Sequence, residues 1–303
     1  MDKLGVLLIA LGDKVYGEQA YNLAMAIKYI SPTTKVCLVH NDTSIANLPT
    51  LSFFDELVRI PEEYYTTDGK PTYFKAKLYL DKLTPFEHTM YLDTDVMFFY
   101  RADISKITNA LVGQCMQPYS LFNVSMTNGL PLIKKEECKA YNYSWFKDLK
   151  GLKRKLGLKS DLPNINSSLV LFSTVEAELA ENEGEIKPVV TSNMIFDVMR
   201  QLYSNPAVRP HIFDFRGDLP DEFFFDVAMC QLDYLPRHSK FQPLYADWLH
   251  NEKRPADIQS RYEGILFSGT GKIAYHNVDI YNKQIEFYSK HFKTKRLLLW
   301  RPK

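Results

Sequence analysis

The run Met90-Tyr91-Leu92-Asp93-Thr94-Asp95-Val96-Met97-Phe98-Phe99 decides the fold, because it sets two carboxylates in a stretch with the composition of a buried strand. Burying an ionised carboxylate is costly unless it is paired, and no Lys, Arg or His lies between Met90 and Tyr100. Side chains at i and i+2 of a strand point to the same side, so Asp93 and Asp95 can share one divalent cation. Oxygen ligands suit Mg²⁺ or Mn²⁺. The alternative is a pair of aspartates capping a strand end or a turn, but the apolar flanks favour the metal site.

Composition sets the class of protein. With 303 residues and a net charge of +1, the chain can form one large α/β domain or two small ones, and its whole surface is not that of a polyanion-binding protein. The four cysteines are scattered, which predicts neither a zinc module nor a disulfide framework and indicates a reducing compartment. The apolar run 4–11 is too short to span a membrane and lacks a cleavage pattern. We therefore expect a cytoplasmic protein without a transmembrane segment.

Strand and helix patterns alternate through the first third. Strands are expected over 4–11, 36–40, 57–60 and around 93–95, and helices over 20–30 and 74–83. This alternation predicts a doubly wound, mixed but mainly parallel sheet flanked by helices, in one domain of residues 1–303 with insertions. In such sheets ligands bind beyond the carboxyl ends of strands, where Gly12, Asn41 and Asp93 fall.

The second half is less regular. A short strand is expected over 169–172, and a helix over 221–232, opened by Pro220, with acidic residues that suit the positive end of its dipole. Residues 265–276 read as a strand, a glycine-rich turn and a second strand that ends at His276. The acidic stretch 176–186 has no assigned chemistry.

These residues resemble the nucleotide-sugar-dependent glycosyltransferases of the GT-A fold, most closely the glycogenin-type, family 8-like retaining group. Tyr91-Leu92-Asp93-Thr94-Asp95 is similar to the Asp-x-Asp motif of that group. The resemblance implies that Tyr16, just before the first helix, lies on a uracil ring. It also implies that Lys77 contacts the donor, with Lys75 as the rival.

The likeness extends toward the C-terminus. Asn166-Ser167-Ser168 resembles the family's Asn, small residue and Gly before a buried strand, with Ser168 in place of the Gly. Asp221-Glu222 followed by Asp226 is similar to Asp-Gln followed by Asn. His276 matches the last metal ligand. The family's Lys-Pro-Trp is missing, and Lys272 or Lys283 is its expected substitute.

The resemblance implies a transfer of sugar from a nucleoside-diphosphate sugar, of the UDP type, to a hydroxyl acceptor with retention, using Mn²⁺ or Mg²⁺. Residues 1–100 would bind the nucleotide and 101–303 the acceptor, which is a glycan, a protein, a lipid or a modified nucleobase. The implied metal ligands are Asp93, Asp95 and His276; the donor-binding residues are Ala10, Gly12, Tyr16, Lys77, Asp93, Thr94 and Lys272; the catalytic residues are Asp221, Glu222 and Asn166.

Two basic stretches interleaved with aromatic residues, 141–159 and 290–303, are unusual on a chain of nearly zero net charge. They predict a docking surface for an anionic acceptor, through nucleic-acid phosphates or membrane headgroups. The other interpretation is a solvated amphipathic helix and a frayed tail.

Three other functions fit the sequence less well. A haloacid dehalogenase-type phosphatase has its Asp-x-Asp at the start of the chain and Thr or Val where Met97 stands. A sugar nucleotidyltransferase would show a Gly-rich basic loop after strand one, and Gly12-Asp13-Lys14 is too sparse for one. A non-catalytic nucleotide-sugar-binding or scaffold protein on the same fold is consistent with the missing Lys-Pro-Trp, but not with intact Asp93, Asp95 and His276.

Overall fold

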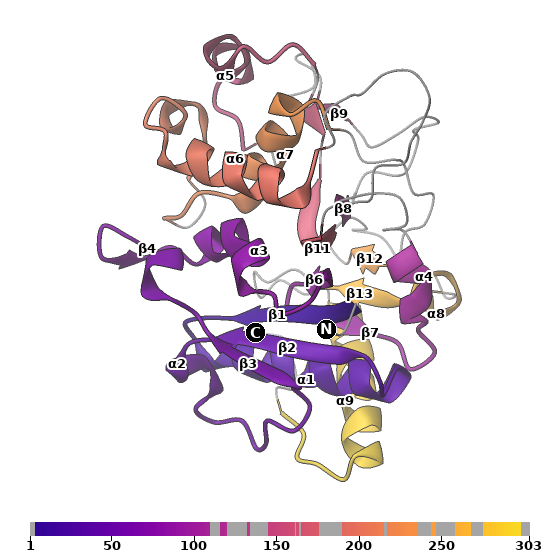
Figure 1. Ribbon diagram of the computed structural model, residues 1–303. Helices are drawn as coiled ribbons and strands as arrows, with labels where there is room; N and C mark the ends of the chain where they lie inside the picture. Colours follow the sequence, from indigo (N-terminus) through magenta and orange to yellow (C-terminus); the bar gives the residue numbers. More distant parts are fainter. Residues whose placement is uncertain are drawn as a thin grey trace. The chain divides into compact units, whose positions relative to one another are not determined.

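The computed structural model describes residues 4–109, 116–119, 132–133, 145–160, 162–163, 165–175, 190–214, 217–234, 244–246, 258–267 and 275–297 (Figure 1). The chain divides into two compact units. The first unit comprises Met1–Ile60, Thr89–Ala110 and Phe241–Lys303, and the second Pro61–His88 and Leu111–Lys240. The expectation of a single domain over residues 1–303 stays a prediction.

The first unit carries the strands and helices predicted at the N-terminus, followed by elements from the C-terminal third. Its elements are β1 Leu4–Ala10, α1 Lys14–Ile30, β2 Lys35–His40, α2 Asp42–Ile45, β3 Glu56–Arg59, β6 His88–Leu92, β7 Val96–Phe98, α4 Ile104–Thr108, β12 Leu244–Ala246, α8 Ile258–Arg261, β13 Gly264–Leu266 and α9 Tyr275–His291.

The sheet of the first unit has the strand order β3-β2-β1-β6. β1 pairs parallel with β2 in a register that runs from Gly5 opposite Lys35 to Ala10 opposite His40, and β2 pairs parallel with β3. The connection from β1 to β2 is the helix α1, because a parallel pair needs a crossover. β1 and β2 are buried over most of their length, which is why both read as continuous apolar runs.

Helix α1 begins directly after β1. Gly12 has φ +78°, a backbone conformation that favours glycine, and it turns the chain from the strand into the helix. Asp13 caps the helix by accepting a hydrogen bond from the Val15 N–H at 3.0 Å. The helix starts at Lys14, earlier than the predicted start at residue 20.

Gly17, in the first turn of α1, packs directly on the backbone of α2. A Cβ atom built at Gly17 would lie 1.8 Å from the carbonyl oxygen of Ser44. We expect Gly17→Ala to lower the free energy of unfolding by about 1–3 kcal/mol, the usual cost of overpacking, although Ala favours a helix intrinsically. Urea unfolding of this variant and of Lys14→Ala, an exposed position of the same turn, makes the comparison. Equal stability of the two variants would show that the contact is not tight.

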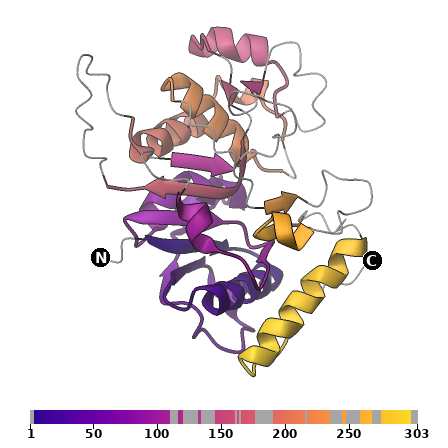
Figure 2. The ribbon, with the colours of Figure 1, turned by 90° about the vertical axis from the view of Figure 1, so that its right-hand side faces the viewer.

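A second sheet and a long helix complete the first unit. β13 pairs antiparallel with β7 and parallel with β12. Helix α9, yellow in Figure 2, contacts α1, and the hydroxyl of Tyr288 donates to the carbonyl oxygen of Phe98 at 2.9 Å. The helix begins at Tyr275, so the strand expected to end at His276 is wrong: this residue is the second of α9.

The second unit consists of η1 Glu62–Tyr64, β4 Thr66–Thr67, β5 Lys70–Pro71, η2 Tyr73–Tyr79, α3 Leu80–Leu83, β8 Met116–Tyr119, β9 Leu132–Ile133, α5 Leu149–Leu156, β10 Leu162–Pro163, β11 Asn166–Ser173, α6 Ser192–Ser204, η5 Arg209–His211 and α7 Asp221–Gln231. β11 pairs antiparallel with β8, and α7 packs on α6, β10 and β11. The predicted helix over 74–83 is a 3₁₀ helix followed by one α-helical turn.

Pairing of β11 with β8 shifts register between Asn166 and Val170. Such irregularities often lie beside functional sites, where they change the direction of side chains. The buried helix α7 contributes three fully buried aromatic side chains to this core, from Phe223, Phe224 and Phe225. Among the described residues, no helix is long and apolar enough to cross a membrane.

Candidate functional site

Asp93, Thr94 and Asp95 form a turn between β6 and β7. The Val96 N–H donates to the Asp93 carbonyl oxygen at 3.2 Å, and the Phe267 N–H, at the end of β13, donates to the Asp95 carbonyl oxygen at 3.0 Å. The placement of both aspartates within a strand is therefore wrong: they lie in a turn that separates β6 from β7. The turn is not an ordinary solvated one, because both carboxylates are half-buried and Thr94 is buried.

Two side chains that the sequence analysis did not single out support this turn. The Tyr91 hydroxyl donates to Oδ1 of Asp93 at 2.5 Å, a charge-assisted hydrogen bond that fixes the carboxylate. The Thr94 hydroxyl donates to Oε1 of Gln19 at 3.1 Å in a buried contact with α1. In the sequence, Gln19 follows Tyr16 by three residues, so the two side chains are neighbours on the surface of one helix. This spacing was the available signal that Gln19 lies near the predicted donor site.

The chemistry of this turn fits a hard divalent cation. The carboxylates of Asp93 and Asp95, two residues apart in one turn, offer oxygen ligands, which Mg²⁺ and Mn²⁺ prefer. Among the described residues, no group of three or more His, Cys, Asp or Glu side chains could hold a metal ion. The His276 side chain lies outside the described residues. Of the three predicted metal ligands, the structure describes the side chains of Asp93 and Asp95.

The end of β1 contributes the other predicted donor residues of the first unit. The Ala10 carbonyl oxygen accepts a buried hydrogen bond from the Ser44 hydroxyl at 2.7 Å, which joins β1 to α2. Tyr16 is the third residue of α1, so its expected place before the helix is wrong. Its side chain is 40% exposed. Part of this large ring is therefore accessible to solvent at the start of the helix.

Lys77 and Asp221 form a buried ion pair in the second unit. Nζ of Lys77 lies 3.1 Å from Oδ2 of Asp221 and 3.0 Å from the Ser167 hydroxyl oxygen. Lys77 is 9% exposed and Asp221 1%. The structure brings together two residues that the sequence analysis placed on opposite sides of the reaction, Lys77 with the donor and Asp221 with the acceptor. Ser167, in the irregular part of β11, was not foreseen as their partner.

Asn166 and Asp226 shape the backbone next to this pair. Oδ1 of Asn166 accepts from the Ser168 N–H at 2.9 Å, and Oδ1 of Asp226 accepts from the Ile165 N–H at 3.2 Å. Both side chains hold the start of β11 in place. Glu222 is half-buried, next to Asp221 at the start of α7.

Asp226 is a fully buried carboxyl group that lies near a second carboxyl group, that of Glu222. Burial raises the pKa of Asp226 well above the ordinary value. The hydrogen bond from the Ile165 N–H lowers this pKa, but by less than burial raises it, and the charge of nearby Glu222 raises it further. The native state therefore holds a proton that the unfolded chain releases above its ordinary pKa of about 4.

We expect Asp226→Asn to stabilise the protein at neutral pH. The amide keeps an acceptor for the Ile165 N–H, and it is neutral without taking up a proton when the chain folds. The wild type should lose free energy of unfolding, relative to the variant, as pH rises from about 4 toward the raised pKa, by up to about 1.4 kcal/mol per pH unit. Urea unfolding of both proteins at pH 4, 5, 6 and 7 measures this difference. A difference that is the same at every pH contradicts it.

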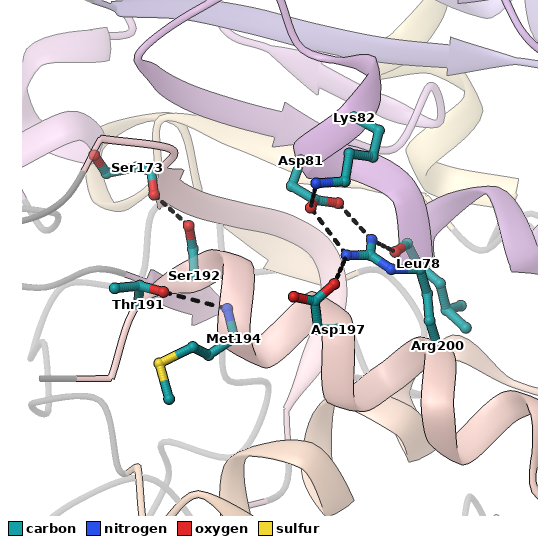
Figure 3. A network of polar contacts seen from close by, with 9 residues as sticks. All are labelled: Leu78, Asp81, Lys82, Ser173, Thr191, Ser192, Met194, Asp197 and Arg200. Atoms are coloured by element: carbon teal, nitrogen blue, oxygen red, sulfur yellow. Dashed lines mark hydrogen bonds and ion pairs between the residues drawn. The ribbon is translucent and has the colours of Figure 1, made fainter. Parts of the chain in front are cut away.

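The 3₁₀ helix that carries Lys77 is fixed at both ends. At its start the Phe74 N–H donates to Oδ2 of Asp218 at 2.9 Å. At its end Nη1 of Arg200 on α6 donates to the Leu78 carbonyl oxygen at 2.8 Å and to Oδ1 of Asp81 at 2.7 Å (Figure 3). The position of the Lys77 backbone is thus set by side chains from two other segments.

Further contacts in Figure 3 anchor α6 itself. Thr191 caps the helix by accepting from the Met194 N–H at 3.3 Å, and the Ser192 hydroxyl donates to the Ser173 carbonyl oxygen at the end of β11. Nη2 of Arg200 also donates to Asp197 one turn earlier on the same helix.

The remaining predicted residues have different outcomes in the structure. Lys75, the rival of Lys77, is held within the protein: its Nζ donates to the Thr66 carbonyl oxygen at 2.6 Å and lies 5.6 Å from the centroid of the Tyr203 ring. Cys37 and Cys230 are buried and are not part of a disulfide. Lys272, the stretch 176–186 and the tail beyond residue 297 lie outside the described residues.

Comparisons with known proteins decide the fold. No family model and no curated protein matches the chain. Among solved structures, the galactosyltransferase LgtC in complex with donor and acceptor sugar analogs is similar with a TM-score of 0.50 and 12% identity, over 94% of this chain and 95% of that one. The chain has the GT-A fold.

A second structure agrees. The bifunctional glycosyltransferase WbbM in its apo form is similar with a TM-score of 0.52 and 13% identity, over 97% of this chain and 52% of that one. The GT-A fold expected from the acidic motif, with its mixed, mainly parallel sheet and flanking helices, is thereby confirmed. The likeness establishes the fold, and the roles of single residues are proposals.

Proposed function

We propose that this protein transfers a sugar from a nucleoside-diphosphate sugar, with uracil as the base, to a hydroxyl acceptor in a metal-dependent reaction with retention. The observation that carries this proposal is the half-buried Asp93-Thr94-Asp95 turn, held by Tyr91 and Gln19 on a GT-A fold. A fold alone does not define a function, but two fixed hard ligands on this fold suit a diphosphate donor.

The donor side is assigned mainly to the acidic turn, the end of β1 and the start of α1. Asp93 and Asp95 would hold Mn²⁺ or Mg²⁺, with His276 as the proposed third ligand and phosphate oxygens in the remaining positions. When bound, the ion supplies Lewis-acid stabilisation of the negative charge that develops on the leaving diphosphate. Tyr16 would stack on the base, next to the backbone of Ala10 and Gly12.

The acceptor side is assigned to the second unit. Asp221 is committed to its ion pair with Lys77, so its proposed role is to orient polar groups of the sugars, together with Asn166 and Glu222. A retaining reaction suits this arrangement, because the departing phosphate can accept the proton of the acceptor hydroxyl and no dedicated strong base is needed. Lys77 and Lys272 are the proposed cationic contacts of the diphosphate.

Calorimetric titration tests the donor assignment. We expect UDP to bind with Mn²⁺ present and to lose most of its affinity when EDTA replaces Mn²⁺, whereas GDP should bind more weakly than UDP under both conditions. Equal binding of UDP with and without the metal would contradict the metal site. Binding without any release of UDP from UDP-sugars would favour the non-catalytic nucleotide-sugar-binding protein.

Tyr16→Ala should weaken UDP binding by about 1–3 kcal/mol, the usual contribution of a base stacked on an aromatic ring. Tyr16→Phe is the matched variant, because it keeps the ring and removes only the hydroxyl group, and it should bind nearly as the wild type. Titration of both variants with UDP in the presence of Mn²⁺ makes the comparison. If Tyr16→Ala retained the wild-type affinity, the exposed ring would have no role in the donor site.

A further inference from the structure

The second unit carries a strongly basic segment around α5. Between Trp145 and Ser160 the chain has six basic side chains against a single acidic one, Asp148. The basic residues are Lys147, Lys150, Lys153, Arg154, Lys155 and Lys159. The proposed donor and acceptor chemistry uses none of them.

Helix α5 packs on the second unit with its basic side chains facing solvent. Leu149 and Leu152 are buried, whereas Lys150 and Arg154, which share one face at i and i+4, are exposed. The helix is fixed in this orientation, since Asp148 accepts from the Gly151 N–H at 2.8 Å and a Cβ atom at Gly151 would lie 1.9 Å from Oδ2 of Asp148.

A distant segment of the chain adds an apolar group to this basic face. The Lys147 N–H donates to the His211 carbonyl oxygen at 2.8 Å, and the Phe213 N–H donates to the Trp145 carbonyl oxygen at 2.9 Å. These bonds set Phe213 beside the start of α5, where Nζ of Lys147 lies 5.5 Å from the centroid of its ring. Phe213 is 48% exposed.

Two features distinguish this face from an ordinary solvated helix. Within the part of the chain that the structure describes, no carboxylate pairs with Lys150, Arg154 or Lys155. Leu156 and Leu158, at the C-terminal end of α5, are half-exposed between the basic residues. Unpaired cations and exposed apolar groups therefore occur together on one fixed element.

We propose that this α5 surface, made of Lys147, Lys150, Arg154, Lys155, Lys159 and Phe213, docks onto a bilayer that contains anionic phospholipids. The cations suit the headgroup phosphates, and the exposed phenyl ring can enter the boundary between headgroups and acyl chains. A nucleic acid suits the surface less well, because the leucines among the cations cannot stack on bases. The inference does not depend on the sugar-transfer function.

Vesicle co-sedimentation of the full chain tests this proposal. Vesicles of phosphatidylcholine and vesicles with one third phosphatidylglycerol are compared at low and at physiological salt. We expect binding to the anionic vesicles only, and weaker binding at the higher salt, since exposed charges are screened. Absence of binding to the anionic vesicles at low salt overturns the proposal.

Charge reversal locates the surface. Lys150→Glu with Arg154→Glu should weaken binding to anionic vesicles by about 30-fold or more, because each basic residue near such a bilayer contributes about fivefold. Phe213→Ser should weaken it on the order of fivefold. The matched control reverses Lys70 and Arg101, which are exposed in other segments and carry the same two charges.

The outcomes separate the alternatives. The α5 variant should keep the wild-type midpoint of urea unfolding, which shows that it is folded, so loss of vesicle binding by this variant alone supports the proposal. Equal loss in the Lys70 and Arg101 control indicates a general charge effect and overturns it. Preferential binding of a single-stranded oligonucleotide that is lost in the α5 variant would assign the surface to nucleic acid and also overturn it.

Discussion

Asp95→Asn is expected to lower the rate of metal-dependent release of UDP from the preferred UDP-sugar by more than about 100-fold, a loss of about 3 kcal/mol of transition-state stabilisation. The amide keeps the size of the side chain but removes the negative charge that a divalent ion requires. The Asp95 backbone oxygen accepts from the Phe267 N–H whichever side chain is present, so the turn should remain folded.

Asp279→Asn is the matched control, because it makes the same chemical change at an exposed position of α9 in the same unit. Its rate should equal that of the wild type. Mn²⁺-dependent binding of UDP should also disappear in Asp95→Asn. If that binding were unchanged while the fold was intact, Asp95 would not be a metal ligand.

Lys77→Met is expected to lower the free energy of unfolding by about 3–5 kcal/mol, because it leaves the Asp221 carboxylate buried without its counter-charge. The pair is among the most buried of the described ion pairs, with side-chain exposures of 11% and 1%. Urea unfolding at pH 7 measures the loss. Combining Lys77→Met with Asp221→Asn should recover part of the stability, since the uncompensated charge is then absent.

The pair Lys82–Asp81 offers a comparison within the same unit. Its separation is similar, 3.2 Å, but the Lys82 side chain is 50% exposed. Lys82→Met should therefore change stability by no more than about 1 kcal/mol. Equal effects of Lys77→Met and Lys82→Met would show that the Lys77–Asp221 pair is solvated in the native protein.

The parts of the fold that sequence reasoning predicted are those with a strong local signal. β1 and β2 are continuous apolar runs, and such runs read as buried parallel strands wherever they occur. The start of α1 was placed too late because its first turn, Lys14 to Gly17, is partly exposed and lacks apolar periodicity. Its capping residue, Asp13, was the local signal for the true start.

The acidic turn shows how tertiary contacts override a local pattern. Residues 90–99 read as one apolar strand, but backbone bonds from Val96 and Phe267 break it at the two aspartates. The second partner lies more than 170 residues away in the chain, so no local pattern could reveal it. The sequence predicted buried aspartates, because apolar neighbours on both sides imply burial, whereas the structure shows both of them half-buried.

Contacts between distant residues account for what was missed at the candidate site. Lys77 and Asp221 were each selected, but their ion pair joins two segments that the sequence leaves unrelated. Ser167 and Gln19 are polar residues of common types, and only their buried hydrogen bonds mark them. The same holds for Phe213, which backbone hydrogen bonds from a distant segment place beside α5.

The central claim, that this GT-A protein cleaves a nucleotide-sugar with the help of a metal bound by Asp93 and Asp95, is tested most directly by measuring nucleoside diphosphate release. A panel of UDP- and GDP-sugars is incubated with the protein in the presence of Mn²⁺ or of EDTA. We predict release of UDP from at least one UDP-sugar with Mn²⁺, and release at least about 100-fold slower with EDTA or in Asp95→Asn. Release of UDP at the same rate with EDTA and in Asp95→Asn, or no release from any sugar nucleotide with Mn²⁺, would contradict the claim.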